Sequence, residues 1–516
     1  MPKNLILRKP IITTDNFLLL LICLVPCAII VGPLIADLFV TIICISYLSE
    51  IIIKRKVNIF KYKLFIFFFS FYIYLLINTF LISNIYKEVW INVIFYFRFI
   101  LFAYASHEIL YRNIDKLKLV YIIFILTLSI TLIDGYFQYF FEINTIGFKK
   151  LRPDRISGFF GDDLVLGSFL LRILPVIFFF TVLLNKNKYF KRVNISLILL
   201  TTMLIFLSGE RASFFLLVIY LFLIVFFLNF NLFIKLFLIV SFPMAIILVQ
   251  MFNPLLFDRY FTQTKTQIFS NDNQILPYYM PLFETAIKIS NDKKFFGLGP
   301  KSFRYYCNNP KYVTYSGRKQ IINNKELTID IGWKNSKKPI ILDLFVKEGD
   351  EINKGDIIFE YYYLNKKKKI KYLSNKSGLI EKIYLKKIYF NGNKLADIDP
   401  SIFNLPDKSS YKINGCSTHP HNYYLQLLSE VGYIGFAFIF GLFLFILAKI
   451  SKMMFLSFTN NKISNLEVCF LSFYFVILFP LSTTGNFFNN WLNILTIYPL
   501  IFYFLSNKIN KHDKFL

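Results

Sequence analysis

Long apolar stretches separated by short polar ones run along most of the chain. An apolar stretch of about 18 residues or more is long enough to cross a lipid bilayer as a helix. The pattern predicts about twelve such spans, at 16–31, 34–53, 63–83, 90–106, 118–137, 164–184, 193–208, 212–229, 232–250, 431–450, 465–482 and 487–506. We therefore predict an all-α polytopic membrane protein with N-terminal helices over 1–250 and C-terminal helices over 431–516.

Basic residues alternate from one connection to the next. They gather in both termini and at 54–63 and 186–192, whereas the loops at 32–33 and 483–486 contain neither Lys nor Arg. Because basic loops stay in the cytoplasm, both termini are predicted to be cytoplasmic. With this orientation, four segments lie on the outer side of the membrane, at 138–163, 209–211, 251–430 and 483–486.

The outer segment 251–430 is far longer than an ordinary connection, and we predict it to be a domain. Its middle, about 326–400, alternates short apolar runs with Gly-containing turns, as strands joined by tight turns do. The pattern is similar to a small β-rich biotinyl/lipoyl-like barrel-sandwich module. Modules that carry a prosthetic group present one lysine on a tight hairpin, but the segment 361–375 is longer and holds several lysines. We therefore expect a structural or docking module and no cofactor.

The composition supports a membrane protein and favours lipids over nucleic acid as its charged partners. A chain of 516 residues that is 56% hydrophobic would expose too much apolar surface as a soluble protein. The net charge of +27 raises the question of nucleic acid, yet many basic residues lie in short loops between spans rather than among aromatic residues on a water-facing domain. The charge fits the surface of a lipid bilayer and anionic lipid substrates better. We expect no nucleic-acid partner.

The six cysteines divide by topology. Four lie in predicted spans, whereas Cys307 and Cys416 lie on the outer side and flank the β-rich insert. A disulfide between these two would close the base of the insertion in an oxidising compartment. Two free thiols are the alternative.

A short polar segment, LSGERASFF at 207–215, separates two predicted spans. Arginine at this depth is costly without an anion. Arg211 therefore pairs either with Glu210 or a lipid headgroup, or with a pyrophosphate, whose oxygens match the fork of the guanidinium group.

A second polar segment, at 149–170, places Arg152 and Arg155 before a Gly-rich turn and Asp162 and Asp163 after it. The arginines either reach toward headgroups from a re-entrant loop or form a second basic wall of a site for an anionic lipid. Two adjacent aspartates suggest Mg²⁺, but no third ligand has a suitable spacing, and we predict no metal.

Two of the four histidines, His419 and His421, lie just before the tenth predicted span. Zinc would need further ligands, and no other histidine lies on the outer side. A general base fits better, because a histidine at the membrane–water boundary can accept a proton from a sugar hydroxyl. Packing or helix capping is the alternative, above all for His419. The neighbouring Asn422 and Tyr423 would orient sugar hydroxyls.

The segment FFGLGPKSFRYYC at 295–307 contains a weak phosphate-loop pattern. No strand, glycine loop and helix surround it, so we predict no nucleotide site.

Four segments together resemble, in order, those of the O-antigen ligase / O-antigen polymerase family. They lie at 155–170, 208–214, 283–307 and 418–436, where the last reads THPHNYYLQLLSEVGYIGF. The plan of about twelve spans with a large periplasmic loop between the ninth and tenth is also similar. The resemblance covers most of the chain except the β-rich insert.

This resemblance implies a metal-independent glycosyltransferase in the inner membrane of a Gram-negative bacterium, with its active site facing the periplasm. Its donor would be a glycan linked to undecaprenyl pyrophosphate, and a ligase would move that glycan to lipid A–core oligosaccharide. The essential histidine of the family matches His421 and an essential arginine matches Arg211. A further arginine of the large loop would be Arg304 or Arg259.

The residues are consistent with such a reaction. Pyrophosphate is a good leaving group, so the protein has to stabilise its charge and remove a proton from the acceptor hydroxyl, and direct displacement would invert the anomeric carbon. The alternatives are a polymerase that uses another lipid-linked repeat unit, another polyprenyl-linked glycosyltransferase, or a transporter of polyprenyl-linked glycans. A transporter would be expected to show internal repeats, and we find none in the sequence.

Overall fold

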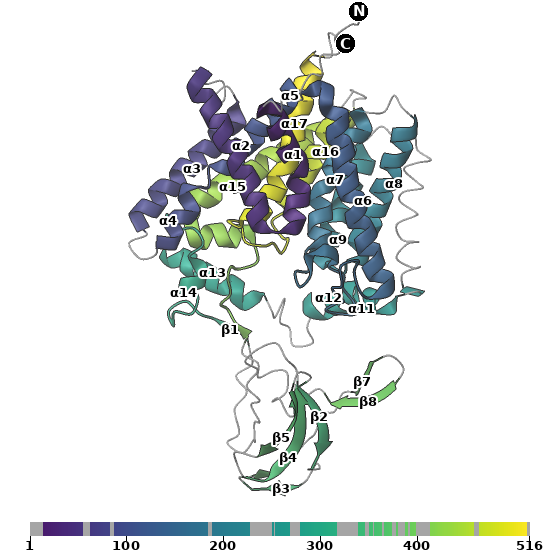
Figure 1. The fold of residues 1–516 in the computed structure, drawn as a ribbon. Helices are drawn as coiled ribbons and strands as arrows, with labels where there is room; N and C mark the ends of the chain where they lie inside the picture. The colour runs from purple at the N-terminus through teal and green to yellow at the C-terminus, as the bar shows by residue number, and fades with distance from the viewer. Residues whose placement is uncertain are drawn as a thin grey trace, which may run out of the picture. The chain divides into compact units, whose positions relative to one another are not determined.

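Figure 1 shows the computed structural model of the chain. The structure describes residues 14–54, 62–82, 87–183, 188–227, 250–251, 253–268, 279–316, 339–345, 350–353, 355–363, 366–373, 378–379, 387–390, 393–398, 413–458 and 464–512. The chain divides into two compact units. The first comprises Met1–Val313 with Gly415–Leu516, and the second comprises Thr314–Asn414.

The first unit is built of helices that lie side by side (Figure 1). Their bounds are α1 Thr14–Val31, α2 Pro33–Lys54, α3 Lys63–Ile82, α4 Lys87–Ile94, α5 Arg98–Arg112, α6 Leu117–Phe141, α7 Leu166–Leu183, α8 Lys188–Leu207, α9 Arg211–Phe227, α11 Pro254–Tyr260, α12 Thr262–Ile268, α13 Met280–Asp292, α14 Phe303–Tyr306, α15 Tyr423–Phe458, α16 Asn465–Ile477 and α17 Asn490–His512.

Nine helical segments in the described part of the chain are long and apolar enough to cross a membrane. They are α1, α2, α3, Val89–Arg112, Ile114–Phe141, α7, α8, Tyr423–Leu456 and Asn490–Ile509. The helices α9 and α16 are also apolar but shorter, with 17 and 13 residues. These helices agree with the prediction of a polytopic helical membrane protein. The number of twelve spans stays a prediction, and the predicted span 232–250 lies outside the described residues except for Gln250.

Helix α7 is the most enclosed of these segments. Within its most apolar stretch 78% of the residues are buried, against 22% for α2. Lipid tails are as apolar as leucine side chains, so helices in a bilayer associate through close packing. The ring of Phe502 on α17 accordingly lies 5.2 and 5.7 Å from the rings of Phe179 and Phe180 on α7. This central helix positions one wall of the site described below.

Helix α15 is interrupted near its start, at Gly432, which adopts a positive φ of 67°. The segment 294–299 packs against this break and hydrogen-bonds to it. A β-carbon on Gly432 would lie 2.2 Å from the carbonyl oxygen of Phe295, and one on Gly297 would lie 2.4 Å from the backbone of Glu430. The glycines of GLG and EVGYIG therefore allow two backbone segments to pack directly on each other.

The buried carboxylate of Glu430 on α15 also stabilises the contact between α15 and the segment before α14. It accepts hydrogen bonds from the backbone N–H groups of Lys301 at 3.0 Å and Phe303 at 3.1 Å, and from the side chain of Gln426 at 2.9 Å. Because burying a carboxylate without partners is costly, these donors are needed for its position. The segment 295–303 is thus held against the first turns of α15.

A disulfide joins Cys307 to Cys416, with 4.9 Å between the Cα atoms. The two cysteines are 109 residues apart in sequence. The points at which the chain leaves and re-enters the first unit are therefore tied together covalently.

The strands that the structure describes lie in the second unit. Their bounds are β1 Tyr315–Ser316, β2 Pro339–Leu344, β3 Glu351–Ile352, β4 Ile357–Tyr363, β5 Lys366–Leu373, β6 Gly378–Leu379, β7 Lys387–Phe390, β8 Asn393–Ile398 and β9 Ile413–Asn414. Five form a sheet in the order β5-β4-β2-β8-β7, and β3 pairs with β6 and β1 with β9. All of these pairs are antiparallel.

The lysine run of the predicted module lies in strand β5, where Lys366 pairs with Tyr363 and Lys371 with Glu360. The strands fall within and around the predicted β-rich range 326–400. The likeness to a barrel-sandwich module stays a prediction.

Candidate functional site

His421 lies in the turn that leads into α15. Its φ is +56°, a left-handed conformation that is uncommon outside glycine and often found at functional sites. Its carbonyl oxygen accepts a hydrogen bond from the backbone N–H of Thr484 at 2.9 Å. The side chain is half-buried, and within the described residues neither ring nitrogen has a hydrogen-bond partner. Burial lowers the pKa of His421 below its usual 6.5, so the ring is neutral at neutral pH and able to accept a proton.

His419 is buried beside it, with 4.2 Å between the two ring centroids. Its Nδ1 lies 2.9 Å from the hydroxyl of Thr418 and its Nε2 lies 3.3 Å from the carbonyl oxygen of Thr484. Because a carbonyl can only accept, we infer that Nε2 carries the proton. Burial, with help from the nearby His421 and Arg304, lowers the pKa of His419 to about 4. His419 therefore holds the turn together rather than facing a substrate.

Asn422 caps α15. Its side-chain oxygen accepts from the N–H groups of Tyr424 at 3.0 Å and Leu425 at 3.1 Å, and its Nδ2 donates to the carbonyl oxygens of Pro480 at 2.7 Å and Ser482 at 3.3 Å. These bonds occupy the full capacity of an amide. The sequence analysis assigned Asn422 to sugar hydroxyls, but the observed bonds give it a capping role.

Tyr423 is also buried and does not line an open surface. Its ring meets the ring of Phe487 edge-on at 5.4 Å, and its hydroxyl interacts with the guanidinium group of Arg172 on α7. Sequence analysis did not single out Arg172. The signal was present, because an arginine inside an apolar span requires a polar or anionic partner.

Arg211 is the first residue of α9 and is half-buried. It lies close enough to the charged groups of Arg259, Arg152 and Asp154 to interact with them, and also to Tyr279. The ring of Tyr279 in turn lies 5.8 Å from the ring of His421. Tyr279 thus links the two residues that the sequence analysis placed at the reaction centre.

Glu210, the alternative partner of Arg211, is used elsewhere. Its carboxylate accepts hydrogen bonds from the backbone N–H groups of Gly167 at 2.7 Å and Ser168 at 3.1 Å and from the hydroxyl of Ser213 at 3.0 Å. Gly167 and Ser168 belong to the first turn of α7, where N–H groups lack partners within the helix. Glu210 therefore caps α7.

Arg259 is buried and holds two loops together. It donates from Nε to the carbonyl oxygen of Gly209 at 2.5 Å and from Nη1 to the carboxylate of Asp154 at 2.8 Å. A β-carbon on Gly209 would lie 2.2 Å from the carbonyl oxygen of Asp154, so the loops touch at this glycine. These contacts give Arg259 the role of positioning the loop that carries Arg211.

Arg152 and Arg155 stand on the second of these loops. Arg152 is exposed and lies 3.3 Å from Asp154. Arg155 donates from Nη2 to the carbonyl oxygen of Leu164 at 2.8 Å, while its buried Nε has no hydrogen-bond partner among the described residues. A buried donor without a partner is costly and fits an acceptor oxygen supplied by a ligand. Arg155 is therefore the better candidate of the two for an anion.

Arg304 and Lys301 lie on the other side of the histidines. Arg304 is exposed and lies near enough to His419 and Lys301 to influence both charges. Lys301 donates to the side chain of Asn92 at 2.7 Å, and burial together with Arg304 lowers the pKa of Lys301 to about 8. The structure thus brings Arg304, but not Arg259, to an accessible position beside the histidine pair.

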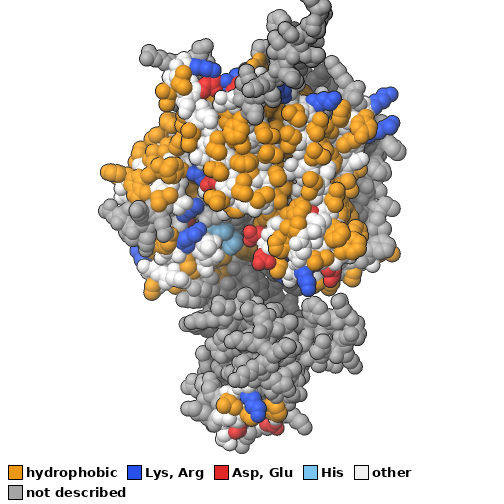
Figure 2. Space-filling view, viewed as in Figure 1, with side chains coloured by type: hydrophobic (Ala, Val, Ile, Leu, Met, Phe, Trp, Pro, Cys, Tyr) orange, Lys and Arg blue, Asp and Glu red, His pale blue; other side chains and the backbone are white. Residues whose placement is uncertain are grey.

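Figure 2 shows histidine side chains at the surface of the helical unit, with basic and acidic side chains nearby. Asp162 and Asp163 are exposed. Within the residues that the structure describes, no group of three or more His, Cys, Asp or Glu side chains is arranged to hold a metal ion. The described residues bring together the half-buried imidazole of His421, the ring of Tyr279 and, beside His419, the guanidinium group of Arg304.

Comparison with known proteins adds no assignment: no family model, no curated protein and no solved structure matches the chain.

Proposed function

We propose that the chain is a membrane-embedded glycosyltransferase that moves a glycan from undecaprenyl pyrophosphate to a hydroxyl of an acceptor glycan. The observation that carries the proposal is the arrangement around Tyr279, which contacts the ring of His421 and interacts with Arg211. In the proposal, the neighbourhood of Tyr279 supplies both a base for the acceptor and a cation for the leaving group.

In the proposed reaction His421 accepts the proton of the acceptor hydroxyl as its oxygen attacks the anomeric carbon. The bond from that carbon to the pyrophosphate oxygen breaks, and undecaprenyl pyrophosphate leaves with the electron pair. Arg211 and Arg155 stabilise the charge that develops on the phosphate oxygens. The anomeric configuration is inverted, and the reaction requires neither nucleotide nor metal because the glycan is already activated.

Within this proposal the acceptor is lipid A–core oligosaccharide, which would make the chain an O-antigen ligase. The protein would lie in the inner membrane of a Gram-negative bacterium, with about twelve spans, both termini in the cytoplasm and the site facing the periplasm. The β-rich unit, with its barrel-sandwich pattern, would serve as a structural or docking module for a bulky acceptor.

The test uses purified protein with undecaprenyl-pyrophosphate-linked glycan, lipid A–core and EDTA. We expect the wild type to transfer glycan to lipid A–core, and we expect His421→Ala and Arg211→Ala each to lower the rate by roughly a hundredfold or more. Lengthening of the lipid-linked glycan without use of lipid A–core would instead identify a polymerase. Full activity of His421→Ala would overturn the general-base assignment.

A further inference from the structure

Arg172 on α7 is buried, and its guanidinium group holds three helices together. The side chain is 7% exposed. Nη1 donates to the carbonyl oxygen of Ser168 at 3.1 Å and to its hydroxyl at 2.6 Å, and Nε donates to the hydroxyl of Thr496 on α17 at 3.2 Å. A further hydrogen bond joins the guanidinium group to the hydroxyl of Tyr423, the first residue of α15. One side chain therefore ties α15 and α17 to α7.

The bond to Ser168 leads to the loop that carries Arg211. The backbone N–H of Ser168 donates to the carboxylate of Glu210 at 3.1 Å, and Glu210 directly precedes Arg211. A β-carbon on Gly167 would lie 2.5 Å from a hydroxyl oxygen of this loop, so the start of α7 packs directly on it. The position of the loop is thus tied to Arg172 through a single residue.

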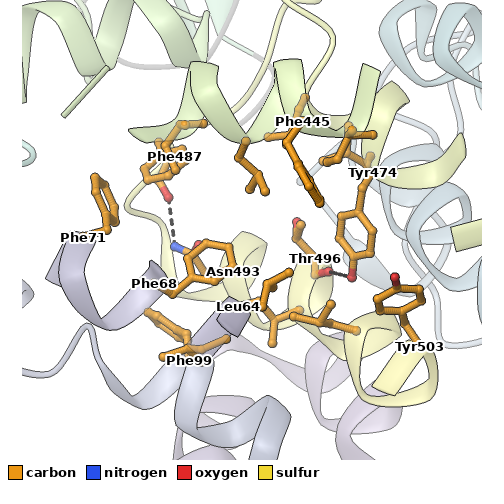
Figure 3. Close-up of a pocket in the computed structure, with 18 of the residues that line it drawn as sticks. Leu64, Phe68, Phe71, Phe99, Phe445, Tyr474, Phe487, Asn493, Thr496 and Tyr503 are labelled. Carbon is orange, nitrogen blue, oxygen red and sulfur yellow. Dashed lines mark hydrogen bonds between the residues drawn. The ribbon is translucent and has the colours of Figure 1, made fainter. Parts of the chain in front are cut away.

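The bond to Tyr423 leads to the turn that carries His421. Tyr423 is buried, and its ring meets the ring of Phe487 edge-on at 5.4 Å. Figure 3 shows that the carbonyl oxygen of Phe487 accepts a hydrogen bond from the amide of Asn493, at 2.9 Å, so Tyr423 packs against an anchored loop. The left-handed backbone of His421 persists only where its surroundings enforce it. The anchoring of Tyr423 therefore contributes to the direction of the imidazole ring.

Two common reasons for an arginine inside a helical bundle do not apply to Arg172. An ion pair would offset the cost of burying the charge, but in the part of the chain that is described no carboxylate forms an ion pair with it. Reaching to the membrane surface would also offset that cost, yet the side chain is buried and α7 is the most enclosed of the nine candidate spans. The guanidinium group instead offers a planar fork that holds several acceptors in one fixed geometry. This property suits a residue that sets the distance between two segments.

We propose that Arg172 is a positioning residue that couples the loop of Arg211 to the turn of His421. The coupling runs through Ser168 on one side and through Tyr423 on the other. The inference rests on the proposed function, in which the base and the cation act on the same sugar and have to keep one separation. A displacement of about 1 Å in such a site can lower a rate by roughly a hundredfold. In this proposal Arg172 contacts neither the acceptor nor the leaving group.

Steady-state kinetics of Arg172→Gln distinguish positioning from binding. We expect kcat to fall by roughly tenfold or more and KM for donor and acceptor to stay within about threefold, because misalignment slows the chemical step and leaves the ligand contacts in place. We expect Arg172→Lys, which keeps the charge and part of the bonds, to regain part of the rate. A raised KM for the donor with unchanged kcat would show that Arg172 binds the lipid-linked phosphate, and would overturn the proposal.

The three partners of Arg172 supply a matched set of variants. Ser168→Ala and Tyr423→Phe each remove one hydroxyl on the route between the two segments, whereas Thr496→Val removes the hydroxyl of a partner that belongs to neither segment. The carbonyl oxygen of Thr496 keeps its bond from Tyr474 at 3.2 Å, so its helix is still held (Figure 3). We expect the first two variants to lower kcat by roughly fivefold or more and Thr496→Val to stay within about twofold of the wild type. Equal rates in all three variants, lowered or not, would contradict the proposal.

A double variant tests whether two of these residues act through each other. If Arg172 acts through Tyr423, adding Tyr423→Phe to Arg172→Gln should lower kcat little further. Losses that multiply would show independent effects and would contradict the coupling.

Hydrogen–deuterium exchange measures the coupling without any substrate. We expect Arg172→Gln to speed exchange of backbone amides in both 206–213 and 418–425, and Thr496→Val to leave both segments as in the wild type. Faster exchange in one segment alone, or in neither, would overturn the proposal. If Arg172→Gln does not fold, the kinetics and the exchange of Ser168→Ala, Tyr423→Phe and Thr496→Val decide the matter.

The two measurements also separate this inference from the proposed function. Absence of transfer by the wild type would reject the proposed function, and exchange would then decide the coupling by itself. Transfer by the wild type together with unchanged exchange in Arg172→Gln would keep the proposed function and reject the coupling.

Discussion

The ring of Tyr279 lies edge-on to the ring of His421, with 5.8 Å between the centroids and 70° between the ring planes. Tyr279 directly precedes α13, whereas His421 precedes α15, so the contact joins segments on either side of the inserted unit. Since Tyr279 also lies near Arg211, one aromatic side chain neighbours both the proposed base and the arginine proposed to bind phosphate.

Removing that ring should impair transfer. Aromatic pairs contribute about 0.5–1.5 kcal/mol, so we expect Tyr279→Ala to lower kcat/KM by up to roughly tenfold. Tyr279→Phe keeps the ring contact and should stay within about threefold of the wild type. The measurement is steady-state transfer with both variants, and equal losses in the two would show that the ring contact is not what matters.

The pH dependence of the transfer rate should reflect the protonation of His421. Its neutral form is the base, and burial lowers its pKa below 6.5. The rate should therefore be flat from pH 6.5 to 8 and fall as the pH drops through the lowered pKa, because the protonated ring cannot accept another proton. Profiles of kcat/KM for the wild type and for residual activity of His421→Ala test this. The same acid limb in both would assign it to another group.

Substitutions of Arg211 and of Arg259 should affect different properties, namely the rate of transfer and the stability of the fold. We expect Arg211→Gln to reduce kcat by roughly a hundredfold, since its proposed contact is made to the leaving group, and to lower Tm less than Arg259→Gln does. Arg259→Gln removes the bonds to Gly209 and Asp154 and should destabilise the protein by about 3 kcal/mol or more. Parallel measurements of rate and Tm distinguish the two, and a reversed pattern would exchange their roles.

The contact between GLG and α15 should be intolerant of side chains. We expect Gly432→Ala to destabilise the protein by about 1–3 kcal/mol or more, because φ is 67° and a β-carbon would lie 2.2 Å from backbone. Gly441→Ala on the same helix meets nothing within 4 Å and should be neutral or slightly stabilising. Thermal unfolding in detergent compares them, and similar Tm values for both variants would contradict the packing argument.

The disulfide should stabilise the protein because it closes a long loop, with an effect that grows with the logarithm of the loop length. Loop-closure entropy for about 100 residues corresponds to nearly 5 kcal/mol at most, and measured effects are often smaller. We expect the double variant Cys307→Ser/Cys416→Ser to have a lower Tm than the wild type, and Cys27→Ser, which alters a free cysteine, to leave it unchanged. Thiol labelling under denaturing conditions would detect one disulfide in the wild type, and labelling of all six cysteines would exclude it.

Sequence analysis predicted the parts of the fold that depend on local pattern. Apolar length predicts membrane helices, and alternation with glycine turns predicts strands, because both signals reside in neighbouring residues. The placement of Cys307 and Cys416 on one side followed from counting spans. Counting spans also predicted that Arg211 and His421 lie at the same end of the helices.

Roles that depend on tertiary contacts could not be predicted in this way. Asn422 stands next to the proposed base, yet its bonds to Pro480 and Ser482 come from a loop about 60 residues away in sequence. The function of Gly297 depends on the break at Gly432, which no local pattern reveals. Arg172 could have been singled out from the sequence, since a lone arginine in an apolar span requires a polar or anionic partner.

Strands β1 and β9 pair at the two ends of the inserted unit, with Tyr315 opposite Asn414 and Ser316 opposite Ile413. The first and last residues of the insert therefore lie side by side. The disulfide between Cys307 and Cys416 joins the flanking segments of the first unit close to the same point. A domain whose ends meet can be exchanged or lost without separating the segments that flank it. The inserted unit is in this sense a replaceable module, and under the proposed function its exchange would alter docking of the acceptor while the helical unit keeps His421 and Arg211.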